Sequence, residues 1–169
     1  MPTGFARRRL VLRHGVLPPL LCALPLSLCA PDRASAQPAH GVYAELLGKG
    51  GLWGLGYDYR LHHRLTVGAV ASAYSLDGQR VITLSPYLGV YLARKGSHGW
   101  FADAGPQAVH TWAPSPIPEW EGYSSSGIGA LIATGYEYRA RLLVRVFAEG
   151  VAGKGGVLPW LGAGVGCAF

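Results

Sequence analysis

Acidic and basic side chains recur at alternating positions within otherwise apolar stretches of this 169-residue chain. In Leu52–Leu61, large apolar residues occupy every second position, and Asp58 and Arg60 lie between them. Successive side chains of a β-strand point to opposite faces, so this pattern predicts a strand with one apolar and one charged face. If the charged faces are enclosed, the acids and bases must pair, because an unpaired buried charge is costly. The residues that we assign to this network are Glu45, Asp58, Arg60, Asp103, Glu137, Arg139, Arg145 and Glu149.

A second candidate for chemistry is His110, which lies near Ser115, Glu119 and Glu121 and near the three serines 124–126. A serine nucleophile with a histidine base hydrolyses esters, including those of membrane lipids. Strand alternation, however, places His110 on the apolar face, where a histidine at an interface is the simpler interpretation. We therefore expect no catalytic residue, and lipid hydrolysis is the minority hypothesis.

The remaining candidates are two histidines and two repeated turns. His62 and His63 are adjacent, but no acid, cysteine or further histidine stands at a spacing that would complete a metal site, and we expect neither metal nor cofactor. The motif Gly-Lys-Gly-Gly occurs at 48–51 and at 153–156, and it lacks the longer spacing of a phosphate-binding loop. We expect two hairpin tips, with Lys49 and Lys154 at an outer rim where they could contact lipopolysaccharide phosphates.

The elements that must position these residues are eight alternating stretches, each bounded by turn-forming or charged residues. None shows a sustained helical period. Pro86 cannot donate to a sheet ladder, so we expect a bulge or a local break there. The breaks after the second, fourth and sixth stretches are short and basic, whereas the longest break, Ala113–Ser126, is rich in Pro and Ser. The predicted strands are Val42–Leu47, Leu52–Leu61, Leu65–Tyr74, Val81–Ala93, Trp100–Trp112, Ile128–Tyr138, Leu142–Glu149 and Val157–Phe169.

Aromatic residues at the ends of the apolar faces indicate that these faces meet lipid. Trp100 and Trp112 share a face and stand twelve residues apart, which corresponds to roughly 40 Å of strand and, with a tilt of about 45°, to nearly the thickness of a bilayer. A soluble barrel with the apolar face inward is the alternative. The predicted aromatic girdle is Trp53, Tyr57, Tyr59, Trp100, Trp112, Tyr136 and Tyr138.

The N-terminus has the three parts of a cleaved secretory signal over residues 1–36: a basic start, an apolar run and the small residues Ala34, Ser35 and Ala36. The net charge of +6 falls when this segment is removed, because five of the fifteen basic residues lie in it. Residues 37–169 then form one domain with ten basic and eight acidic residues. That near balance excludes nucleic acid as a partner.

The secretory signal, the eight alternating stretches and the terminal Phe169 together resemble the small outer-membrane β-barrel proteins of Gram-negative bacteria, the broad OmpA-like, OmpX-like and OmpW-like group. The resemblance implies an all-β fold, an eight-stranded antiparallel up-and-down transmembrane barrel, in the outer membrane. It implies outer-membrane lipid and lipopolysaccharide as surroundings and a monomeric state. It also implies that Phe169 is the signal read by the barrel-assembly machinery.

Three functions remain open from the sequence. The first is a structural or surface-interaction role without catalysis, with the loop Ala113–Ser126 displayed. The second is OmpW-like binding or passage of a small hydrophobic molecule, which would be favoured if Pro86 or Pro106 opened the wall. The third is a lipid A-modifying enzyme that uses His110 and a loop serine.

Overall fold

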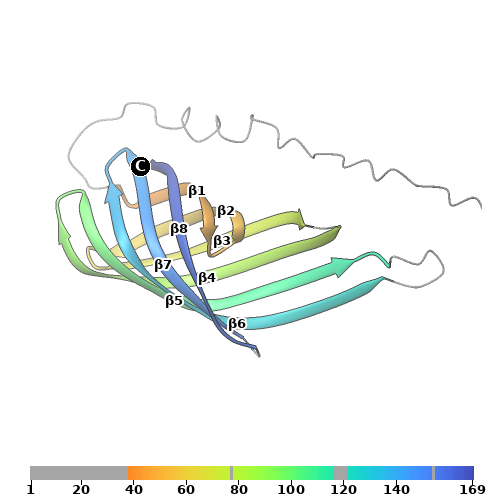
Figure 1. The fold of residues 1–169 in the computed structure, drawn as a ribbon. Helices are drawn as coiled ribbons and strands as arrows, with labels where there is room; N and C mark the ends of the chain where they lie inside the picture. Colours follow the sequence, from red (N-terminus) through yellow and green to blue (C-terminus); the bar gives the residue numbers. More distant parts are fainter. Residues whose placement is uncertain (1–37, 77, 116–121, 154) are drawn as a thin grey trace, which may run out of the picture.

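The protein is a closed barrel in which each strand pairs antiparallel with the next and β1 closes the sheet against β8 (Figure 1). This computed structural model describes residues 38–76, 78–115, 122–153 and 155–169, so the predicted signal at 1–36 lies outside the described residues. The strands are β1 (His40–Gly48), β2 (Gly51–His62), β3 (Leu65–Leu76), β4 (Gln79–Lys95), β5 (His98–Ala113), β6 (Tyr123–Arg139), β7 (Leu142–Gly153) and β8 (Gly156–Ala168).

All eight predicted strands are present in order, and the main correction concerns the β5–β6 hairpin. β5 continues to Ala113 and β6 begins at Tyr123, so Ser124, Ser125 and Ser126 are strand residues rather than loop residues. Trp112 pairs with Ser124. The β5–β6 ladder continues from the barrel wall into residues 123–126, although the Ser-rich composition of this segment predicted a loop.

The two ends of the barrel differ. At one end, which we call the turn end, short turns follow β2, β4 and β6, and both the start of β1 and the end of β8 lie there (Figure 1, left). At the opposite end, the loop end, four hairpins join β1 to β2, β3 to β4, β5 to β6 and β7 to β8. The predicted difference in length is confined to the β5–β6 connection, residues 114–122, because every other connection at either end is two residues long.

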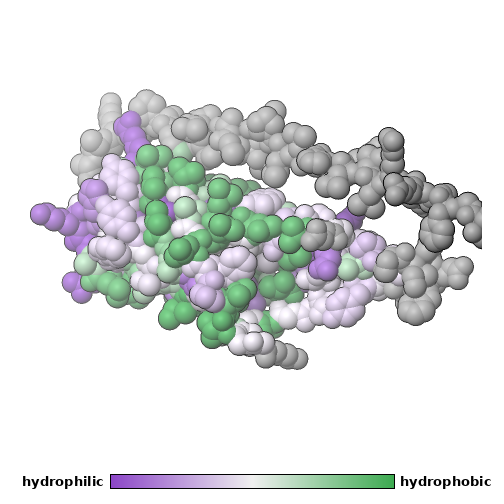
Figure 2. All heavy atoms as spheres, in the orientation of Figure 1, coloured by the Kyte–Doolittle hydropathy of each residue, from purple (hydrophilic) through white to green (hydrophobic). Residues whose placement is uncertain are grey.

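The barrel wall is apolar outside and polar inside. Leu88 on β4 is 57% exposed and Ile132 on β6 is 64% exposed, whereas Asp58 on β2 is fully buried. In the view of Figure 2, apolar side chains gather around the middle of the barrel, and strongly hydrophilic ones lie at the turn end on the left. Among the described residues there is no helix of the length and apolarity that crossing a membrane requires.

Pro86 interrupts the ladder without a bulge. Between β4 and β5, pairing stops after Leu84 with Ala108 and resumes at Leu88 with Ala104 in the same register. That register places Pro86 opposite Pro106, and neither ring nitrogen can donate. The wall nevertheless stays closed, because a Cβ added to Gly105 would lie 2.0 Å from the Pro86 carbonyl oxygen. The prolines therefore provide a local break and no lateral opening.

Candidate functional site

Arg145 on β7 lies at the centre of the barrel interior and contacts three carboxylates. Its Nε lies 3.0 Å from Oε2 of Glu137, and its Nη2 lies 3.3 Å from Oδ2 of Asp103. Its Nη1 is 3.9 Å from Oδ2 of Asp58. The guanidinium also lies over the ring of Phe101, 4.2 Å from the centroid. One cation thus joins acids from β2, β5 and β6.

A second group of ion pairs lies on the turn-end side of Arg145. Arg139 Nη2 is 2.6 Å from Oδ2 of Asp58, and its Nε is 2.9 Å from Oε1 of Glu137. Arg60 Nη2 lies 3.8 Å from Oε1 of Glu137, which also accepts a hydrogen bond from the Tyr91 hydroxyl. Charge-assisted contacts of this kind offset the cost of removing the charges from water.

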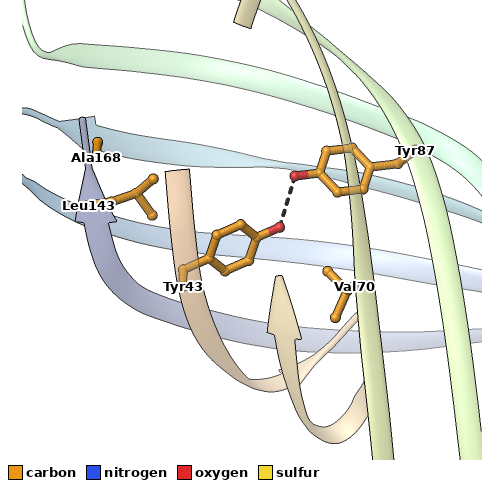
Figure 3. Close-up of a cluster of buried hydrophobic side chains, with 5 residues drawn as sticks. All are labelled: Tyr43, Val70, Tyr87, Leu143 and Ala168. Carbon is orange, nitrogen blue, oxygen red and sulfur yellow. Dashed lines mark hydrogen bonds between the residues drawn. The ribbon is translucent and has the colours of Figure 1, made fainter. Parts of the chain in front are cut away.

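Two tyrosines connect the ion pairs to an apolar cluster. The hydroxyls of Tyr43 and Tyr87 are 2.8 Å apart, and Val70, Leu143 and Ala168 are buried in the same cluster (Figure 3). Arg145 Nη1 donates to both hydroxyls, at 3.3 and 3.2 Å. The cross-section at this level is filled by side chains, as an eight-stranded barrel allows.

The structure buries all eight residues that the sequence assigns to the network, at 8% exposure or less. Six of them take part in ion pairs among themselves. Glu45 and Glu149 have no ion pair with any described residue, although Glu45 Oε1 accepts a hydrogen bond from the Gly50 amide at 3.0 Å.

The prediction that Lys49 lies at an outer rim is wrong. Lys49 is fully buried, its Nζ lies 3.1 Å from Oδ2 of Asp103, and it stands over the rings of Tyr87 and Phe147 at 4.8 and 4.5 Å. The tip of the β1–β2 hairpin folds into the lumen instead of extending outward. Lys154 lies outside the described residues.

Side chains from three strands hold the inward-folded turn. The Lys49 carbonyl accepts from Ser85 Oγ and Gln107 Nε2, both at 2.8 Å. The Gly50 carbonyl accepts from Ser72 Oγ at 2.6 Å and Thr83 Oγ1 at 3.0 Å. Both carbonyls of the buried turn are thus satisfied from the opposite wall, as buried polar groups require. We call this element the plug turn.

The hairpin tip leaves the wall where it folds inward. Pairing of β2 with β3 ends at Leu55 and Ala71, and pairing of β1 with β8 ends at Leu46 and Ala163. Positive φ angles at Leu47 (50°) and Gly51 (91°) accompany the bend. The loop-end segments of β3 and β8 consequently have no strand partner on this side.

Most of the aromatic residues predicted to form a girdle lie near the turn end of the barrel. Tyr57, Tyr59, Trp100, Tyr136 and Tyr138 lie on the outer face toward the turn end, where histidines join them: His40 Nδ1 is 2.9 Å from the Tyr57 hydroxyl, and His98 hydrogen-bonds to Tyr136. Trp112 lies on the outer face near the loop end.

Two residues remain, Trp53 of the predicted girdle and Phe169, the predicted assembly signal. Trp53 is half-buried and belongs to the tip that leaves the wall. Phe169 is exposed at the turn end and stacks on the His40 ring, with centroids 5.6 Å apart.

The two histidine candidates differ in their surroundings. His110 Nδ1 lies 2.8 Å from Oγ of Ser126 across the β5–β6 ladder, beside an outer groove of about 400 Å³ lined by apolar residues such as Ile82 and Ile128. His62 Nε2 and His63 Nδ1 are 3.0 Å apart in the exposed turn. Across the described ranges, no three His, Cys, Asp or Glu side chains come together as a metal site.

Two solved structures share this architecture. The N-terminal β-barrel domain of Pseudomonas aeruginosa OprF matches with a TM-score of 0.60 and 15% identity, over 79% of this chain and 100% of that one. Ail, the attachment invasion locus protein of Yersinia pestis, matches with a TM-score of 0.53 and 12% identity over the same shares. The chain has the fold of the small outer-membrane β-barrels. No family model and no curated protein matches the sequence.

Proposed function

We propose that this protein is an integral outer-membrane barrel with a structural or surface-interaction role and no enzymatic activity. The observation that carries the proposal is the distribution of polarity: nine charged side chains are buried inside a closed sheet whose outer face is apolar. Water would favour the opposite arrangement, and lipid favours this one.

The barrel is proposed to be closed to ions. The ion pairs around Arg145 and the plug turn occupy the lumen in succession from the turn end to the loop end. An eight-stranded barrel filled in this way has no continuous aqueous path.

The surface proposed to meet other molecules is the β5–β6 hairpin. Pairing of β6 with β7 begins at Ala130, whereas pairing with β5 extends to Tyr123. The hairpin therefore extends past β7 and β8 at the loop end, with Tyr123 and Ile128 exposed. One similar structure is that of an attachment invasion locus protein, which is compatible with a surface role for this fold.

Epitope labelling of intact cells tests this orientation. An epitope inserted within residues 116–121 should be labelled on intact Gram-negative cells that express the chain. A matched epitope between His63 and Arg64, at the turn end, should be labelled only after permeabilisation. Labelling of the second epitope alone on intact cells would reverse the proposed orientation, and labelling of neither in a membrane fraction would contradict the location.

Phe169 is proposed to direct assembly, because it is exposed at the end of the last strand. Replacing Phe169 by Ala should lower the fraction of folded barrel in cells while the purified variant still folds in detergent. An equal loss of folded barrel in cells and in detergent would indicate that Phe169 contributes to packing only.

Hydrolysis of a lipid ester is a second candidate, favoured by the hydrogen bond between His110 and Ser126 beside an apolar outer groove. Mass spectrometry of lipid A from cells that express the chain tests it. Under the first proposal the lipid A profile is the same with and without the chain, and a lost acyl group that reappears with His110→Ala would establish the second.

A further inference from the structure

A blind cup opens above the plug turn at the loop end. Its volume is about 430 Å³, and Gly48 and Gly51 of the hairpin tip contribute to its lining. The walls are mostly apolar and aromatic, with Tyr74, Val109, Val151, Leu158 and Trp160 pointing inward from four strands. Because the plug turn closes the lumen beneath it, the cup is a dead end rather than the mouth of a channel.

Within the described part of the chain, one carboxylate in this apolar cup has an oxygen without a hydrogen-bond partner. Glu149 lines the cup, is 5% exposed, and its Oε2 has no hydrogen-bond partner among the described residues. Its cross-strand neighbour is Trp160. An unsatisfied buried carboxylate oxygen is costly, so this group is ready to accept a donor from a ligand.

The charges around Glu149 do not balance, because acids outnumber bases there. Among the described residues, the charged groups that face Glu149 are Lys49, Glu45 and Asp103, and the one base of these three, Lys49, lies against Asp103. In a low-dielectric interior, this excess of negative charge attracts a cation.

We propose that the cup binds a small organic ammonium ion with an apolar body. The ammonium would donate to Glu149 Oε2, and the body would pack against Trp160, Leu158 and Tyr74. An aromatic ring next to a carboxylate favours an organic cation through cation–π attraction. A bare metal ion would need several oxygen ligands, and the described residues around the cup supply no such group.

Calorimetric titration of the full barrel, purified and folded in a non-ionic detergent, tests the proposal. The probe is phenethylammonium chloride, and the matched neutral probe is 2-phenylethanol. The wild type should bind the ammonium saturably and at least about tenfold more tightly than the alcohol, as a charge-assisted hydrogen bond predicts. Glu149→Gln should weaken ammonium binding by about tenfold and change alcohol binding by less than about twofold. Leu158→Trp, which fills the cup, should weaken both.

Three results would overturn the proposal: absence of saturable ammonium binding to the wild type, unchanged ammonium binding to Glu149→Gln, or failure of Glu149→Gln to fold. The last would show that the carboxylate serves the fold. None of them bears on the membrane role, which rests on the outer face of the barrel.

Discussion

Arg145 is the residue on which the buried charges depend. Replacing it by Ala leaves Asp103, Glu137 and Asp58 short of one shared cation. Breaking a buried ion pair by removing one partner typically costs about 3 to 5 kcal/mol, so we expect the free energy of unfolding of Arg145→Ala to fall by about that amount. Urea unfolding of the detergent-folded protein measures it.

The matched control for this variant is Arg64→Ala, at an exposed position in a turn-end loop. Its unfolding free energy should stay within about 0.5 kcal/mol of the wild type. Equal unfolding of Arg145→Ala and the wild type would contradict the network.

The sequence predicted which charged residues lie inside, because the alternation of a strand fixes the face of each residue. It did not predict their partners. Asp58 and Arg139 meet across 81 positions of sequence, and only the closed barrel brings them together. Lys49 was missed because its turn position carries no strand parity.

Among the elements, the plug turn is held in part by two side chains that donate to the same carbonyl oxygen, that of Lys49. Ser85→Ala and Gln107→Ala each remove one hydrogen bond to the Lys49 carbonyl, and each should lower the unfolding free energy by about 1 kcal/mol. The double variant should lower it by more than the sum, because the buried carbonyl then loses both side-chain donors. Additive losses would show that the carbonyl is satisfied in another way.

Close contact between β4 and β5 gives a second prediction at this scale. A methyl group on Gly105 would meet the backbone of Pro86 at 2.0 Å, whereas one on Gly127 would meet nothing within 4 Å. Gly105→Ala should therefore destabilise the barrel by about 1 to 3 kcal/mol or more, and Gly127→Ala should be nearly neutral. Thermal unfolding followed by circular dichroism compares the two, and equal midpoints would mean that the strands separate at the prolines.

Elements whose conformation follows from local alternation were predicted correctly. Elements whose conformation depends on contacts with distant strands were missed. The eight strands follow from alternation. The inward course of the Gly48–Gly51 turn requires Ser72, Thr83, Ser85 and Gln107 to meet it across the lumen, which is long-range information. Ser124–Ser126 have loop-like composition, and their strand conformation comes from pairing with β5.

For the whole molecule, a charged side chain on the lipid-facing outer surface should destabilise the barrel, and the effect should be largest near the middle of the bilayer. Leu88 is 57% exposed near the middle of β4, and Ile128 is 82% exposed on the outer face of β6 toward the loop end. In lipid vesicles, Leu88→Arg should lower the unfolding free energy by about 2 to 4 kcal/mol and Ile128→Arg by about 0 to 1 kcal/mol. Equal, small effects would indicate that both positions face water.

The overall architecture was predictable because apolar alternation, aromatic placement and the order of short and long breaks all indicate one barrel. Alternation alone leaves open which face of the strands is inside, since a soluble barrel has the same alternation, and the sequence favoured an apolar outer face through its aromatic residues. The structure answers this with buried ion pairs and an exposed apolar belt.

The most direct test of the closed outer-membrane barrel compares the electrophoretic mobility of boiled and unboiled outer-membrane fractions from cells that express the full chain. A closed barrel with a buried charge network should resist detergent until boiled, so we expect a band in this fraction that shifts on heating. A soluble periplasmic band that does not shift would contradict it, because the apolar face would then have to point inward.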